Sequence, residues 1–123
     1  MARIALIDDD ATEAMILEGM LEHAGGAHSL VHAPSVAAFA TLAEEADLVL
    51  LGRRLPPHED FAVGVAALAG TGWRGPVVLI SAFSEAAKPD APAGLVLIGP
   101  VDKADLLTPE SVAAVVDAAL RET

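Results

Sequence analysis

Five short runs of mostly branched aliphatic residues recur along the chain, separated by segments with helical spacing. The runs are Ile4–Ile7, Ser29–His32, Leu48–Leu51, Val77–Ile80 and Leu95–Ile98. Four of them are continuously apolar, which is typical of strands buried on both faces of a parallel sheet. The second run is the polar exception and suits an edge strand. The alternation predicts an α/β fold, with helices on both faces of a parallel sheet.

Capping residues and glycines mark the helices between these runs. An acidic capping pattern at Asp10 predicts a first helix that ends at Gly25-Gly26. Ser35 can cap a second helix over residues 36–43, and Phe61–Ala69 predicts a third. The last helix begins at Thr108-Pro109, with proline at the first helical position, and should run to about residue 121.

The segment Phe83–Gly94 breaks this alternation. It contains Pro89 and Pro92, and only residues 84–88 have room for a helical turn. A helix before the last strand is therefore expected to be short or missing. Since the chain has no repeat, no linker and no shift in composition, we expect a single domain over residues 1–123 with no output domain.

Composition narrows the classes of function. The chain has 123 residues, 18 acidic against 7 basic side chains, a formal net charge of −11 and no cysteine. The missing cysteines exclude disulfide scaffolds and thiolate chemistry. The acidity argues against nucleic acid and membranes as partners, because phosphate binding needs cationic side chains. No stretch is long enough to span a bilayer and no signal-peptide pattern is present, so we expect a cytoplasmic protein with a protein partner.

Three consecutive acids, Asp8-Asp9-Asp10, follow the first predicted strand. In a doubly wound sheet, ligands bind beyond the carboxyl ends of the strands. Adjacent carboxylates at such a place repel one another unless a divalent metal or a basic side chain lies among them. The alternative is that Asp10 caps the first helix and the other two acids are solvated.

Four segments resemble the receiver domains of bacterial two-component response regulators, in the order and near the spacing of that family. These segments are residues 4–10, 47–51 with Leu55-Pro56, 76–82 and 99–102. The resemblance covers essentially the whole chain. It implies a flavodoxin-like (CheY-like) three-layer sandwich, whose five-stranded parallel sheet has the order 2-1-3-4-5.

The resemblance also places the family's phosphorylation site on this chain. The acidic pair that binds magnesium in the family falls on Asp8 and Asp9, and the hydroxyl that contacts the phosphoryl group falls on Ser81. The phosphoacceptor aspartate is replaced by Gly52, and the lysine before a proline is replaced at Gly99-Pro100. Conventional phosphotransfer is therefore not expected, the chain is not expected to be an enzyme, and magnesium binding should be weak or absent.

Several side chains near this site leave two readings open. Arg54 follows the vacant acceptor position and either forms an ion pair with Asp8 or Asp9, replacing metal and lysine, or is solvated. Without a phosphoryl ligand, Ser81 is expected to bond a neighbouring backbone group. The family has a cis peptide where this chain has Gly99-Pro100, so a cis bond is expected there.

The sequence therefore predicts a pseudo-receiver, a phosphorylation-independent protein–protein interaction module in bacterial two-component signalling. The partners that the resemblance implies are a histidine kinase, a phosphotransfer protein or another regulator. The alternative is a small-molecule sensor that uses the vacated acidic pocket. Away from this site, the four histidines are expected at the surface, and Trp73 either anchors a partner or is buried against the third helix.

Overall fold

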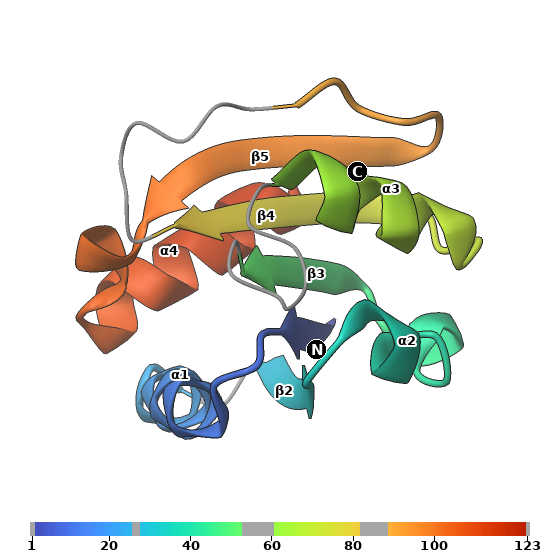
Figure 1. Cartoon of the computed structure of the whole chain (residues 1–123). Helices are drawn as coiled ribbons and strands as arrows, with labels where there is room; N and C mark the ends of the chain where they lie inside the picture. The colour runs from blue at the N-terminus through green and yellow to red at the C-terminus, as the bar shows by residue number, and fades with distance from the viewer. Residues whose placement is uncertain (1, 26–27, 53–60, 82–88, 123) are drawn as a thin grey trace.

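Five parallel strands form one sheet in the order β2-β1-β3-β4-β5 (Figure 1). The computed structural model describes residues 2–25, 28–52, 61–81 and 89–122. The strands are β1 (Ala2–Ile7), β2 (His28–Ala33), β3 (Leu48–Gly52), β4 (Gly75–Ser81) and β5 (Leu95–Asp102). Each of the five predicted runs lies within one of them, and the strand order is the predicted 2-1-3-4-5.

Helices cover both faces of the sheet and complete the three-layer sandwich (Figure 1). On one face, α1 (Ala11–His23) and α4 (Pro109–Leu120) bury a core that includes Ile4, Leu6, Leu17, Leu50 and Val116. On the other face, α2 (Val36–Phe39) and α3 (Phe61–Gly70) bury a core that includes Phe39, Leu51, Val65, Trp73 and Leu79. Because the central strands are buried from both sides, their sequences are continuously apolar.

The first and last helices begin at the predicted caps. The Asp10 side chain accepts hydrogen bonds from the backbone N–H groups of Thr12 at 2.9 Å and Glu13 at 3.2 Å. The Thr108 hydroxyl accepts one from the backbone N–H of Ser111 at 3.1 Å, and a proline follows at the first helical position. Asp10 is therefore a helix cap, as one of the two alternatives for the three acids had it. That alternative also expected Asp8 and Asp9 to be solvated, which holds for Asp9 but is wrong for Asp8, because Asp8 is 7% exposed.

The second helix is shorter than predicted. Instead of covering residues 36–43, it ends at Phe39 and is followed by a turn and a 3₁₀ helix, η1 (Ala43–Glu45). The Thr41 hydroxyl donates to the Ala38 carbonyl at 2.9 Å, and the Leu42 backbone N–H donates to the Phe39 carbonyl at 2.7 Å. These short-range bonds compete with the α-helical ladder and tighten the chain.

Between β4 and β5, the described residues 89–94 form no helix. This agrees with the predicted short or missing helix, although residues 82–88 lie outside the described ranges. Trp73 precedes β4 and is 6% exposed. Its indole N–H donates to the Ala46 carbonyl at 3.0 Å, and its ring meets Phe39 edge-on at 6.0 Å. Of the two readings for Trp73, burial is therefore correct.

Candidate functional site

The carboxyl end of β1 brings Asp8 beside the end of β3. Ile7 pairs in register with Leu51, so the next residues along these strands, Asp8 and Gly52, are neighbours. A Cβ added to Gly52 would lie 2.8 Å from Asp8 Oδ2 and 3.2 Å from Asp8 Cγ. The Asp8 carboxyl group thus fills the space that a side chain at the acceptor position would need.

The three consecutive acids have different environments. Asp8 is only 7% exposed, whereas Asp9 and Asp10 are exposed. Burial raises the pKa of Asp8 above its ordinary value, and the carboxyl groups of Glu13 and Asp9 raise it further. The Asp10 backbone N–H, which donates to Asp8 Oδ1 at 2.9 Å, and the Lys103 ammonium act in the opposite direction on this pKa. The balance favours the neutral form of Asp8 more than water would.

A lysine from far along the chain supplies positive charge to this region. Lys103 begins the 3₁₀ helix η2 (Lys103–Leu106) directly after β5, and its Nζ lies 2.7 Å from Glu13 Oε2. The side chains are 38% and 22% exposed, so the pair is partly shielded from water. Sequence reasoning missed Lys103, because 90 residues separate it from Glu13 and no motif links them. Arg54 lies outside the described residues, so its ion pair stays a prediction.

Gly99, to which the resemblance assigns the lysine position of the family, is surrounded by backbone atoms. Two residues of β5, Gly99 and Pro100, lie opposite Leu79 alone, which makes a β-bulge. Gly99 has a φ of +100°, and an added Cβ would lie 2.6 Å from the Val101 backbone nitrogen and 3.0 Å from the Leu79 carbonyl oxygen. The Gly99-Pro100 peptide is cis, as expected. No side chain fits at this position without a change in the strand.

Ser81 lies at the same edge of the sheet as Gly52. It ends β4, is 1% exposed and pairs in register with Asp102, whereas Gly99 lies further back along β5. The fold therefore brings Asp8, Gly52 and Ser81 toward one edge, with Gly99 set deeper. Hydrogen bonding of Ser81 to a neighbouring backbone group stays a prediction.

Two histidines of β2 correct the expectation that all four lie at the surface. The His32 Nε2 lies 2.6 Å from the Asp8 carbonyl oxygen and donates to it. The His28 Nδ1 accepts from the Ala2 backbone N–H at 3.3 Å, and its Nε2 lies 3.0 Å from Asp117 Oδ1. Both rings are half-buried because they supply polar contacts from the edge strand to β1 and α4. These two histidines are therefore only partly at the surface.

The residues at the carboxyl edge do not fit a magnesium site of the family's kind. The third carboxylate is absent at Gly52, and Asp8 uses Oδ1 to accept the Asp10 backbone N–H while Oδ2 faces Gly52. Within residues 2–25, 28–52, 61–81 and 89–122, no group of three or more His, Asp or Glu side chains is arranged to hold a metal ion. Weak or absent magnesium binding at Asp8 and Asp9 stays a prediction.

In the described part of the chain, no helix is long and apolar enough to cross a membrane.

No protein-family model matches this chain, and no curated protein matches it. Solved structures do match it. The N-terminal domain of a response regulator/sensory box/GGDEF protein from Carboxydothermus hydrogenoformans has a TM-score of 0.69 at 20% identity, covering 97% of this chain and 94% of that one. A response regulator receiver domain protein from Bacillus halodurans has a TM-score of 0.68 at 16% identity, covering 96% of each chain.

A third solved structure is the BeF3-activated receiver domain of RstA from Klebsiella pneumoniae. Its TM-score is 0.62 at 22% identity, covering 97% of this chain and 98% of that one. The protein therefore has the fold of response regulator receiver domains, and at these identities the likeness concerns the fold alone. What the protein does must be argued from its own residues.

Proposed function

We propose that this protein is a pseudo-receiver, an interaction module of two-component signalling that accepts no phosphoryl group and is not an enzyme. The observation that carries the proposal is the environment of two glycines. Gly52 offers no carboxylate, and Asp8 Oδ2 stands where its side chain would be. Gly99 offers no cation, and the backbone around it admits no side chain. Phosphoryl transfer needs both an oxygen nucleophile and cationic stabilisation of the developing charge.

A small-molecule phosphodonor such as acetyl phosphate tests this part of the proposal. Intact-mass measurement after incubation with the donor and magnesium should show no phosphoryl adduct. The matched variant is Gly52→Asp, which restores a carboxylate without touching Gly99. An adduct on the unaltered chain, mapped to an acidic residue of the carboxyl edge, would contradict the proposal.

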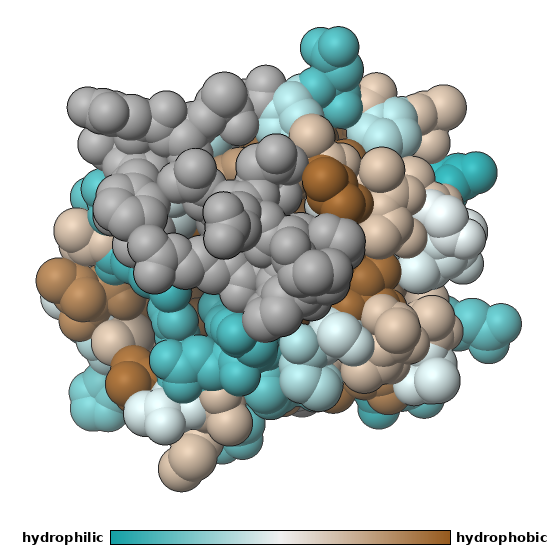
Figure 2. Space-filling model, in the orientation of Figure 1, coloured by the Kyte–Doolittle hydropathy of each residue, from teal (hydrophilic) through white to brown (hydrophobic). Residues whose placement is uncertain are grey.

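An exposed apolar surface at the same end of the molecule supports a role in protein binding. Met15 and Ile16 of α1 are 74% and 52% exposed, and Leu107, which follows η2, is 70% exposed. The ion pair between Lys103 and Glu13 joins η2 to α1, so these apolar residues belong to neighbouring segments. We call Met15, Ile16 and Leu107 the docking face. Figure 2 shows brown surface over both segments at the left of the view. Isolated apolar residues are ordinary, but neighbouring ones favour a contact site.

Charge around the docking face indicates what kind of partner it fits. The exposed acidic residues on these segments and directly beside them are Asp9, Asp10, Glu18, Glu22, Asp105 and Glu110. A complementary surface would present apolar side chains flanked by Lys or Arg. A cytoplasmic histidine kinase, phosphotransfer protein or other regulator with such a surface is the partner we infer. The alternative of a sensor pocket at the acidic site has less support, since Asp8 takes the space beside Gly52.

Affinity capture with paired variants tests the docking face. Ile16→Glu should lose the partner captured from native lysate, because a carboxylate would be buried against an apolar contact. Val63→Glu is the matched control, since Val63 lies on α3 and is 43% exposed. Equal capture by both variants, with unchanged melting temperatures, would contradict this location.

A further inference from the structure

The amino ends of the strands, opposite the carboxyl edge, enclose a second feature with polar chemistry. An open hollow of about 560 Å³ lies there, between the starts of β1, β2 and β4 and the end of α4. Its apolar lining includes Ala2, Pro76 and Leu120, and its polar side chains are Asp47, Arg74 and His28. The His28 Nε2 is already engaged by Asp117 at 3.0 Å, which leaves Asp47 and Arg74. It shares no residue with the site around Asp8.

The stem of the Arg74 side chain packs against Gly94. Gly94 has a φ of +88°, and a Cβ there would lie 2.0 Å from Arg74 Cδ and 2.5 Å from Arg74 Nε. The arginine stem therefore rests on the bare Cα of Gly94, whose carbonyl accepts the Gly75 backbone N–H at 3.0 Å. Only glycine at position 94 leaves this path open. Arg74 is exposed, so a ligand in the hollow can reach it from solvent.

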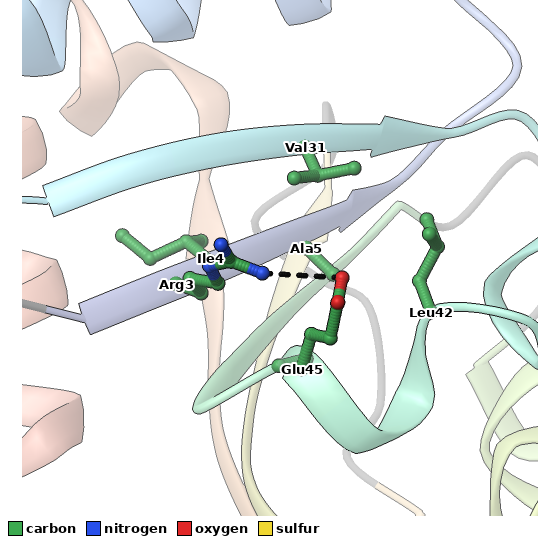
Figure 3. Close-up of a pocket in the computed structure, with 7 residues that line it drawn as sticks. Arg3, Ile4, Ala5, Val31, Leu42 and Glu45 are labelled. Carbon is green, nitrogen blue, oxygen red and sulfur yellow. Dashed lines mark ion pairs between the residues drawn. The ribbon is translucent and has the colours of Figure 1, made fainter.

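The charges of the hollow are not paired with each other. Asp47 accepts the Arg3 backbone N–H at 2.8 Å through Oδ2, but among the described residues neither Asp47 nor Arg74 forms an ion pair. The small neighbouring pocket differs. It has about 10 Å³ of space, and its two charged residues, Arg3 and Glu45, already pair at 3.1 Å (Figure 3). The hollow thus keeps one cation and one anion available above an apolar lining.

We propose that this hollow binds a small zwitterion, an α-amino acid with an apolar side chain. Its carboxylate would meet Arg74, its ammonium group would meet Asp47, and its side chain would contact Pro76 and Leu120. Two separated charges of opposite sign are complementary to a ligand that carries both. A ligand with only one charge would pair with either Arg74 or Asp47 and leave the other side chain unpaired.

Amide NMR titration of the whole chain with L-leucine tests this proposal. Saturable shifts should concentrate at Ala2, Asp47 and Arg74. The two probes that each lack one charge, 4-methylpentanoate and isopentylamine, should each bind at least about tenfold more weakly. The variants Arg74→Gln and Asp47→Asn should weaken L-leucine binding by about tenfold or more, which corresponds to loss of one charge-assisted contact.

Arg121→Gln is the matched control, because it removes the same charge from an exposed residue next to the hollow. It should bind L-leucine as the unaltered chain does. The proposal is overturned if L-leucine gives no saturable shifts, if 4-methylpentanoate binds as tightly, or if Arg74→Gln and Arg121→Gln behave alike. The spectrum of each free variant shows whether it is folded, so loss of fold is not mistaken for loss of binding.

Discussion

Two glycines occupy the positions that the resemblance assigns to the phosphoacceptor and the lysine of receiver domains, and their surroundings differ. At Gly52, the nearest atom to an added Cβ is a side-chain oxygen, Asp8 Oδ2 at 2.8 Å. At Gly99, the nearest atom is the Val101 backbone nitrogen at 2.6 Å, and φ is +100°. A carboxyl group can rotate away, but a backbone nitrogen inside a sheet cannot. A side chain at position 52 is therefore opposed mainly by another side chain, whereas a side chain at position 99 is opposed by the course of β5.

This difference shows at which of the two positions a functional side chain is harder to introduce. An acidic residue at position 52 needs a new rotamer of Asp8 and a small shift against the Ile7 carbonyl oxygen, which lies 3.3 Å from the added Cβ, but no unusual backbone, since Gly52 has no positive φ. A lysine at position 99 needs the bulge opposite Leu79 to be rebuilt. A chain with a carboxylate at position 52 but no lysine at position 99 would have Lys103 as the described cation near Asp8, and Lys103 is already paired with Glu13. We therefore regard the β5 backbone as the stronger structural support for a phosphorylation-independent role.

The largest expected effect comes from Gly99→Ala. A left-handed φ and contact with two backbone atoms should cost about 3 kcal/mol or more in the free energy of unfolding. Urea denaturation followed by circular dichroism measures this loss. Gly19→Ala in α1 is the control, since nothing lies within 4 Å of its added Cβ, and it should stabilise the protein by about 0.5–1 kcal/mol. Similar stabilities for the two variants would show that the backbone at Gly99 is not closed.

The second effect, at Gly52, should be smaller and should depend on metal. Gly52→Asp places a second carboxylate against Asp8, which should lower the free energy of unfolding by about 1–2 kcal/mol without divalent cations. Magnesium should restore the lost free energy of unfolding, because Asp8, Asp9 and the carboxylate introduced at position 52 then lie at one edge of the sheet. Gly52→Ala is the control, with the same contact but no charge, and should be insensitive to magnesium. Calorimetric titration with no magnesium binding to Gly52→Asp would contradict the proximity of Asp8.

The sequence was sufficient for the fold, because the signals that determine it are local. Continuous apolar runs identified the buried strands, and the polar run at 29–32 identified the edge strand β2. The caps Asp10 and Thr108 marked where α1 and α4 begin. The length of α2 was not predictable in this way, since it depends on whether the Thr41 hydroxyl turns back to the Ala38 carbonyl.

The candidate site was predictable only where it follows the strand ends. Asp8, Gly52 and Ser81 lie at one edge of the sheet because the parallel strands that carry them end there. Lys103 was missed, since its contact with Glu13 joins segments far apart in sequence. The direction of the Asp8 carboxyl group depends on packing, and no sequence motif predicts it. This direction makes a side-chain oxygen the nearest atom to Gly52, in contrast to the backbone atoms around Gly99.

Lys103→Met tests how the Lys103 ammonium affects Asp8, the residue beside Gly52. Removing the cation leaves Glu13 unpaired near Asp8 and should lower the free energy of unfolding by about 1 kcal/mol at neutral pH. It should also raise the pKa of Asp8 further, because Lys103 lowers that pKa in the unaltered chain. Arg3→Met removes a pair whose side chains are 54% and 63% exposed and should change stability little. Equal losses in both variants would show that Lys103 is an ordinary surface lysine.

Asp8→Asn should give the smallest effect, and in the opposite direction. Since the pKa of Asp8 is raised in the folded state, the native protein holds a proton that the unfolded chain releases between the ordinary value of 3.8 and the raised value. Stability therefore falls as pH rises through that window and stays lower above it. Asparagine is neutral throughout and can still accept the Asp10 backbone N–H. Melting temperatures should favour Asp8→Asn at neutral pH and converge with the unaltered chain below the ordinary value. Asp105→Asn, which makes the same substitution at an exposed position, is the matched control. A lower melting temperature for Asp8→Asn at neutral pH would mean that the carboxylate is stabilised where it lies, and that the space beside Gly52 holds a charge the surrounding groups favour.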